Sequence, residues 1–342
     1  MEEQSALASR DSATISSIED RTLEVLRNTF ARLDKEFCSL CTKGGRNWDC
    51  GSTALAALVV DDVVTLANLG DCRGVVCRVV SSGIVESADA DWHELDVDVD
   101  GDMPWDRAAN RAFPPDKRLF WREITETHSP LLPEEEERIK AANGWIIDET
   151  EIPTGQIHRM DFFDEDVVDI VKRCFADRLG QHRSDPARSI RIARTCGDLA
   201  VSRAIGDRDF KAAYNSPNGI QTISEDRTDL AMSWEGPQVF LYPTGHSRRF
   251  KGDLVSSIPD IKFLKIGQED VLGEFLLMAC DGLWDVMDGD DAVRIAKNLL
   301  FDKKLSAKDG AERLAELAKH LGSSDNITVI LIRFYWEQIG NK

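Results

Sequence analysis

Apolar residues recur along the chain with two different periods, and each period predicts one kind of element. After residue 17 the apolar positions are three and four apart, which predicts a helix of about 25 residues with one apolar stripe. Ser16 and Glu19 stand at capping-box spacing just before this stripe, so we expect the helix to begin there. The stripe consists of Leu23, Leu26, Phe30, Leu33, Phe37 and Leu40.

Three runs rich in β-branched and small residues follow the helix. Asp61-Asp62 and Gly70-Asp71 separate them, and both pairs are typical of turns. We therefore expect three consecutive strands that form an antiparallel meander. The predicted strands are Thr53–Val60, Val63–Leu69 and Gly74–Val80.

The C-terminal third has regular patterning again, after a short helix predicted to begin at Pro133 and end before Asn143-Gly144. Strands joined by turns, with the helices clustered between them, are typical of an α+β fold with antiparallel sheets. The expected elements are a buried strand at Phe275–Cys280, helices at Asp291–Leu300 and Ser306–Leu321, and a final strand at Asn326–Phe334.

Two polar stretches, at about 81–120 and about 149–190, interrupt this pattern, and we interpret them as insertions into a single domain spanning residues 1–342. The first insertion holds nine acidic residues between Glu86 and Asp106 and no basic residue. Its Asp96-x-Asp98-x-Asp100-Gly101 segment imitates an EF-hand loop, but the twelfth position is Arg107 instead of a bidentate Glu. A calcium-responsive protein is therefore kept only as an alternative.

The amino-acid composition excludes some classes of function. The net charge of −19 argues against binding to nucleic acid or to anionic membranes, because both need a basic surface. The sequence has no apolar run long enough to span a bilayer and no secretory leader, so we expect a cytoplasmic or nuclear protein.

Eight cysteines in 342 residues indicate reduced thiols rather than a disulfide scaffold. Cys38 and Cys41 have no matching pair or His, so we expect no zinc or redox role for them.

Two aspartates stand at the ends of predicted strands. Asp281 lies in Cys280-Asp281-Gly282, and Asp325 lies in Ser324-Asp325-Asn326. A carboxylate held rigidly after a buried strand suits a hard divalent cation. The same residue pairs are also common in turns, so the pattern alone leaves metal binding and turn formation both open.

Six short segments, which occur in the family's order between residues 51 and 329, resemble the metal-dependent protein phosphatase family (PPM, type 2C). This resemblance implies a β-sandwich of two antiparallel sheets with helices on both outer faces. The segments are Gly51–Ala54, Ala67–Arg73, Glu137–Ile139 with Asn143–Trp145, Leu199–Asp207, Ala279–Met287 and Gly322–Val329.

The resemblance also implies a chemistry. Members of the family use two Mg²⁺ or Mn²⁺ ions and a metal-activated water to hydrolyse phosphoserine and phosphothreonine in proteins. Carried over position by position, Asp281 and Asp325 match ligands of the dinuclear centre, and Asp285 matches a ligand of a weaker third metal. Arg203 and Asp207 match signature positions that we interpret as structural, in a buried ion pair or a turn. The resemblance assigns no further catalytic residue.

The sequence departs from the family pattern in its N-terminal part. The R-x-x-M-E-D and D-G-H-G-G motifs, the second of which supplies the bridging Asp, do not occur, and Thr127 replaces the Asp that precedes His128. Two divalent ions about 4 Å apart repel each other by about 16 kcal/mol at an effective dielectric constant near 20. Without the bridging Asp, the two matched ligands Asp281 and Asp325 bring two negative charges against four positive ones, so a stable two-ion site is not expected. We therefore expect an N-terminally incomplete phosphatase fold of marginal stability and impaired activity. The alternative is a catalytically inactive, phosphatase-like binding protein. The sequence gives neither the substrate nor the oligomeric state.

Overall fold

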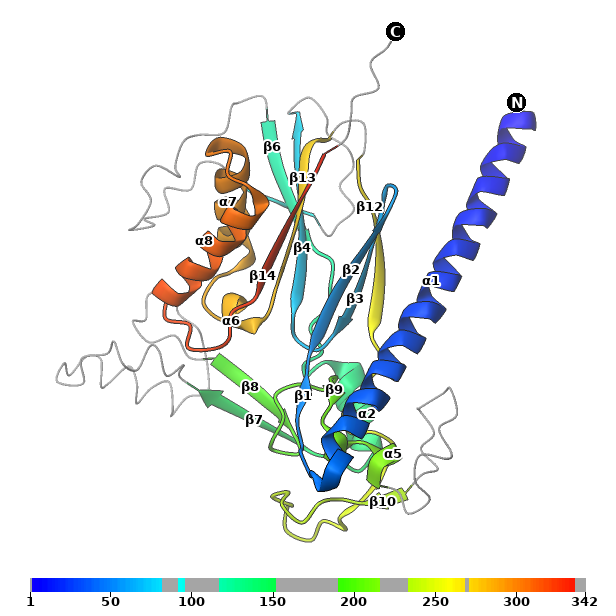
Figure 1. The fold of residues 1–342 in the computed structure, drawn as a ribbon, viewed down its shortest axis with the longest axis vertical. Helices are drawn as coiled ribbons and strands as arrows, with labels where there is room; N and C mark the ends of the chain where they lie inside the picture. The colour runs from blue at the N-terminus through cyan, green and yellow to red at the C-terminus, as the bar shows by residue number, and fades with distance from the viewer. Residues whose placement is uncertain are drawn as a thin grey trace, which may run out of the picture.

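Two antiparallel sheets lie against each other in the computed structural model, and helices cover their outer faces (Figure 1). The structure describes residues 2–81, 92–95, 117–151, 190–215, 233–267 and 271–335. This architecture confirms the α+β sandwich expected from the sequence. None of the helices in the described part is long and apolar enough to cross a membrane.

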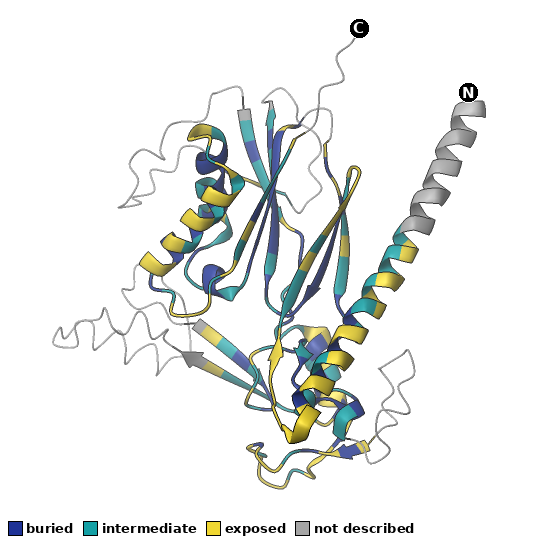
Figure 2. Ribbon diagram, in the orientation of Figure 1, coloured by how far each residue is buried: buried dark blue, intermediate teal, exposed yellow. Residues whose placement is uncertain are grey.

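The larger sheet has five strands in the order β14-β13-β4-β6-β5. Its interior strand β13 is buried at nearly every position, because helices cover one face and the second sheet covers the other. Figure 2 shows this burial along β13 and β4. The strands are β4 (Arg73–Ser81), β5 (His93–Glu94), β6 (Lys117–Glu123), β13 (Val271–Ala279) and β14 (Val329–Phe334).

The helices on the outer face of this sheet come from the C-terminal third. Val293, Leu300 and Leu314 pack with Phe275 and Leu277 of β13 in one buried cluster. The N-cap Ser306 accepts a hydrogen bond from the Asp309 backbone N–H at 3.1 Å, as its spacing predicts. The elements are α6 (Asp281–Trp284), α7 (Gly289–Lys297), the π-helical turn η4 (Asn298–Asp302) and α8 (Ala307–His320).

The smaller sheet has the order β12-β3-β2, with β2 (Ala54–Val60), β3 (Val63–Leu69) and β12 (Asp260–Lys265). Val64 and Leu66 of β3 pack against Val76 and Leu276 of the larger sheet and form the interior of the sandwich. The three N-terminal strands lie where they are predicted, but the meander is wrong. The chain leaves the smaller sheet after β3 and enters the larger sheet at β4, so only β2 and β3 are neighbours.

Helix α1 (Glu2–Thr42) runs beside the smaller sheet (Figure 1). It begins well before the predicted cap, because residues 2–15 contain neither Gly nor Pro to stop it. The predicted stripe is also partly wrong. Leu33 and Leu40 are 43% and 56% exposed, whereas Asp34 is fully buried in the line from Phe30 to Cys38.

A third group of short elements lies below the sheets in Figure 1 and packs around Phe210, Trp234, Phe250 and Leu254. The predicted helix at Pro133 is confirmed, and Asn143 ends it with φ of 68°. Two short segments of this group form the antiparallel pair β10·β11, where the sequence pattern predicts no strand. The elements are η1 (Lys43–Gly45), β1 (Gly51–Ser52), α2 (Pro133–Ala141), β7 (Ile146–Glu151), β8 (Ile190–Thr195), β9 (Ile205–Gly206), η2 (Arg208–Phe210), α5 (Ala212–Asn215), β10 (Ser233–Glu235) and β11 (Arg249–Lys251).

Most of both predicted insertions lies outside the described residues, and so do Cys174 and the EF-hand-like segment at Asp96–Gly101. Four of the described free thiols lie in or beside the sheets and the packed group below them: Cys72, Cys77 and Cys196 are buried, and Cys280 is half-buried.

Candidate functional site

Strand register brings three aspartate-bearing turns to one end of the larger sheet. Ala279, at the end of β13, pairs with Arg73 at the start of β4 and with Val329 at the start of β14. Asp281 therefore leaves the sheet at the end where Asp71 and Asp325 enter it. Asp285 follows Asp281 one turn later, because its backbone N–H donates to the Asp281 carbonyl at 2.8 Å.

The carboxylates at this end of the sheet lie within electrostatic reach of one another. Burial, together with the charges of Asp281 and Asp285, raises the pKa of Asp71 to about 6. Burial and the charge of Asp325 raise the pKa of Asp281. The structure thus places Asp281, Asp285 and Asp325, predicted from sequence, around one region of negative potential.

Asp71 is the member of this group that sequence reasoning misses. The pattern marks it only as a turn residue of the segment Ala67–Arg73. A usable signal is nevertheless present, because Asp71 directly follows the buried strand β3 in the same way that Asp281 follows β13. Sequence spacing could not show that these two strand ends meet.

Close backbone approach holds the Asp281 and Asp325 loops together. A Cβ on Gly282 would lie 2.3 Å from the Asn326 carbonyl oxygen, so only glycine fits at this position. Cys280 Sγ lies 3.1 Å from the same carbonyl oxygen, and the Thr328 N–H donates to that sulfur at 3.2 Å. The Asp-Gly and Asp-Asn pairs therefore have a packing role as well as their turn role.

Each of these two carboxylates also accepts a hydrogen bond from the next residue. Asp281 Oδ1 accepts from the Gly282 N–H at 2.8 Å, and Asp325 Oδ1 accepts from the Asn326 N–H at 2.6 Å. Such bonds fix the orientation of a carboxylate and favour its charged form.

A buried ion network supports the Asp71 turn from behind. The Gly70 N–H donates to His128 Nδ1 at 3.0 Å, and His128 Nε2 lies 3.2 Å from Asp260 Oδ2. Arg203 Nη1 donates to Asp260 Oδ1 at 2.9 Å, and Arg203 Nη2 donates to Glu135 Oε1 at 2.7 Å. The signature arginine is thus in a buried ion pair, as expected.

The electrostatics of this network hold its acids in the charged form. Burial alone would raise the pKa of Glu135, but Arg138 and Arg203 outweigh it and hold the pKa at about 2. The hydrogen bond from His128, together with Arg203, keeps the pKa of Asp260 well below its ordinary value despite burial. Asp207 makes no pair with Arg203; it stands at a left-handed turn with φ of 46°, in front of η2.

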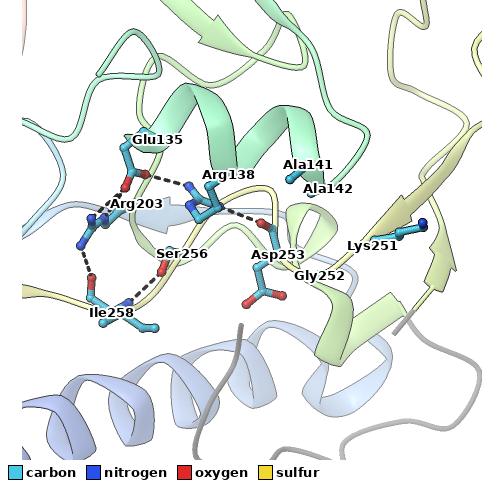
Figure 3. A pocket seen from close by; sticks show the side chains of 10 residues that line it. All are labelled: Glu135, Arg138, Ala141, Ala142, Arg203, Lys251, Gly252, Asp253, Ser256 and Ile258. Atoms are coloured by element: carbon cyan, nitrogen blue, oxygen red, sulfur yellow. Dashed lines mark hydrogen bonds and ion pairs between the residues drawn. The ribbon is translucent and has the colours of Figure 1, made fainter. Parts of the chain in front are cut away.

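A pocket of about 290 Å³ adjoins the network and is lined by Glu135, Arg138, Arg203, Lys251 and Asp253, among others (Figure 3). Arg138 donates hydrogen bonds to protein oxygens through both of its Nη atoms, and Arg203 does so through Nε and both Nη atoms. These hydrogen bonds stabilise the packing of α2 against the signature segment.

The fit of the site to divalent cations is partial. Carboxylate oxygens are the donors that Mg²⁺ and Mn²⁺ prefer, and the mutual repulsion of Asp71 and Asp281 would be relieved by a cation. Within the described ranges, however, no three His, Cys, Asp or Glu side chains are gathered closely enough to hold a metal ion. The donor chemistry thus suits one cation, whereas the residues that the structure describes do not assemble a complete two-ion centre. The assignment of Asp281, Asp285 and Asp325 as ligands stays a prediction.

Comparison with known proteins decides the family. The family model described as "Protein phosphatase 2C" matches residues 3–91 and 115–327. The chain belongs to this family. The match confirms the resemblance found in the sequence motifs, and membership implies metal dependence for the family as a whole.

Curated phosphatase 2C proteins are similar over nearly the whole chain but at low identity. The human integrin-linked kinase-associated serine/threonine phosphatase 2C is 23% identical over 328 residues, which cover 93% of this chain and 53% of the relative. Protein phosphatase 2C 57 of Arabidopsis thaliana is 26% identical over 315 residues, which cover 90% and 55%. The chain thus spans about half the length of the curated relatives it matches.

Among solved structures, a serine-threonine phosphatase 2C from Toxoplasma gondii is similar, with a TM-score of 0.45 and 18% sequence identity. The similarity covers 94% of this chain and 71% of that chain.

Proposed function

We propose that this chain is a protein serine/threonine phosphatase domain of the 2C type. In this proposal it acts on phosphoserine and phosphothreonine in proteins, and its activity is low. Asp281 and Asp325 together hold one Mg²⁺ or Mn²⁺ ion, and Asp285 and Asp71 add negative potential nearby. A bound divalent ion would supply a polarised phosphoryl oxygen and an activated water.

One observation carries the proposal: Asp71, Asp281 and Asp325 come from three separate turns and meet at one end of the β-sandwich. Like charges in a half-buried site disfavour the folded state unless a cation compensates them. A cation bound at this end of the sandwich would compensate these charges, which supports the proposal. The expected impairment rests on the missing carboxylate of the D-G-H-G-G motif, because a carboxylate that bridges two divalent ions offsets their strong mutual repulsion.

A second candidate function is a phosphatase-like binding protein without catalysis. It is favoured by the lack of a three-donor metal site among the described residues. In that case the acidic end of the sandwich would bind a cation or a basic partner segment, and no phosphate would be released.

The test combines two measurements on the whole chain. Mn²⁺ binding is followed by isothermal titration calorimetry, and hydrolysis of a phosphothreonine peptide is followed by phosphate release with and without a chelator. We expect weak Mn²⁺ binding and slow, chelator-sensitive hydrolysis, both lost in Asp281→Ala. Asp62→Ala is the matched control, because Asp62 lies in the exposed β2–β3 turn, where its carboxylate is 3.3 Å from Lys265 Nζ.

The outcomes separate the candidates. Hydrolysis that the chelator and Asp281→Ala both abolish supports the phosphatase. Mn²⁺ binding without any phosphate release favours the binding protein. Hydrolysis that is unchanged in Asp281→Ala refutes the role assigned to that carboxylate.

A further inference from the structure

Two cysteines that are nine positions apart in sequence bring their sulfur atoms together at the end of α1. The Sγ atoms of Cys41 and Cys50 are 3.7 Å apart. Cys41 lies in the last turn of α1 and is 2% exposed, whereas Cys50 lies just before β1 and is exposed. The pair thus joins a protected thiol to one that solvent can reach.

Backbone contacts hold both cysteines in place. The Trp48 N–H donates to the Cys41 carbonyl at 3.2 Å and closes the loop between the two residues. The Cys50 carbonyl accepts from the Asp207 N–H at 2.9 Å. A Cβ on Gly206 would lie 2.3 Å from that carbonyl oxygen, so the glycine permits the contact. These contacts place the two sulfur atoms opposite each other.

The reversal of the chain between the two cysteines depends on a pair of glycines. Gly44 and Gly45 have φ of 72° and 77°, in the left-handed region that glycine enters without strain. Nothing lies within 4 Å of the Cβ position at either glycine. This open loop lets Cys50 move a short way without disturbing packed side chains.

We propose that Cys41 and Cys50 are an oxidation site that forms an intramolecular disulfide when a hydroperoxide reaches Cys50. The sulfur atoms need to approach from 3.7 Å to about 2.05 Å. A rotation of the exposed Cys50 side chain, together with a small shift of the open loop, supplies this movement.

The chemistry balances in two steps. The Cys50 thiol releases its proton, the thiolate attacks the peroxide, and an S–O bond forms as the O–O bond breaks; the sulfenic acid results, and the hydroxide that leaves takes up the released proton as water. The Cys41 sulfur then attacks the Cys50 sulfur, the S–S bond forms, and hydroxide leaves and takes the Cys41 proton as water. Two thiols lose two electrons and two protons, and one hydroperoxide is reduced.

The roles of the two sulfurs follow from their surroundings. Burial and the contact with Cys50 raise the pKa of the Cys41 thiol, so it is not the thiolate that meets the oxidant. Cys38 lies one turn earlier on α1 and is 2% exposed, and burial raises its pKa to about 11. Cys38 is therefore the nearest competitor for the link and the appropriate internal control.

The disulfide would close the loop from Cys41 to Cys50 and attach α1 covalently to β1, which pairs with β9. Closing such a loop restricts the unfolded chain, so the oxidised protein should melt at a higher temperature, by on the order of 5 °C.

The experiment uses the reduced 342-residue protein, treated with hydrogen peroxide, blocked with an alkylating reagent and digested with trypsin. Cleavage at Lys43 and Arg46 separates the two cysteines into residues 36–43 and 47–73. We expect a dithiothreitol-sensitive link between these peptides, with fragment ions that assign it to Cys41 and Cys50. The link persists in Cys38→Ala and is lost in Cys50→Ser, which changes an exposed side chain.

Two results would overturn the proposal. The first is oxidation of Cys50 to its sulfinic or sulfonic acid while Cys41 stays alkylatable. The second is a link that joins two chains, or joins Cys50 to Cys38. The readout is covalent mass, so the outcome does not depend on whether the chain hydrolyses phosphoesters.

Discussion

Replacing Asp34 by alanine should cause one of the largest losses of stability available in this chain. Asp34 is fully buried on α1. Its Oδ1 accepts from Lys211 Nζ at 2.5 Å and from the Gly206 N–H at 2.9 Å, and its Oδ2 lies 3.2 Å from the Tyr214 hydroxyl. One carboxylate thus fixes α1 to the signature segment.

The magnitude follows from what the substitution leaves behind. Lys211 is also fully buried, and after Asp34→Ala its ammonium group would keep only the Ala204 carbonyl at 2.9 Å as a partner in the described contacts. Breaking one side of a buried ion pair costs about 3–5 kcal/mol, because the remaining charge is uncompensated. A folded domain is typically stable by about 5–15 kcal/mol, so this loss is a large fraction of the total free energy of unfolding.

The assay is urea unfolding followed by far-ultraviolet circular dichroism and tryptophan fluorescence. The matched control is Glu36→Ala on the same helix, whose partner Arg32 lies 3.8 Å away with both side chains about two-thirds exposed. An exposed pair of this type contributes less than about 1 kcal/mol. The double variant Asp34→Leu, Lys211→Met removes both charges and should lose less stability than Asp34→Ala alone.

The reasoning would be refuted if Asp34→Ala lowered the free energy of unfolding no more than Glu36→Ala does. It would also be refuted if the double variant were as unstable as the two single variants combined, since stranded charge could then not be the cause.

Three further predictions concern the same sandwich. Burial, only partly offset by Lys211, raises the pKa of Asp207 from 3.8 to about 6, so the folded state loses about 3 kcal/mol of stability as the pH rises from 4 to 6. Asp207→Asn should therefore reduce the slope of the melting temperature against pH between pH 4 and 7. An unchanged slope would contradict this prediction. Gly51→Ala places a Cβ 2.2 Å from Asp207 Oδ2 and should cost about 1–3 kcal/mol in urea unfolding; an unaffected midpoint would disprove the steric conflict. Val59 is 43% exposed on the edge strand β2, so Val59→Lys should reduce self-association measured by analytical ultracentrifugation. Equal association of both proteins would show that this strand edge does not mediate self-association.

Local patterns in the sequence were sufficient where the structure is decided by near neighbours. The strands β2 and β3, the helix after Pro133 and the Ser306 cap all lie at or within one residue of the predicted positions. Each depends on side-chain alternation, turn residues or caps within a few positions along the chain. The family could also be predicted from the sequence, because each motif is a continuous run of residues and the motifs occur in the family's order.

Contacts between distant segments were decided by the tertiary structure. The hydrophobic stripe predicted for α1 includes Leu33 but not Asp34, although Asp34 is the buried residue, because its partner Lys211 lies 177 positions later. Asp71 joins Asp281 only through the register of β4 on β13.

The sequence by itself therefore determined several of the strands and helices and the family to which the chain belongs. Only the tertiary structure decided that β3 and β4 belong to different sheets, that a charged pair anchors α1, and that Cys41 faces Cys50. The physical reason is that secondary structure follows from short-range periodicity, whereas the burial of a charge or a thiol depends on which distant segment packs against it.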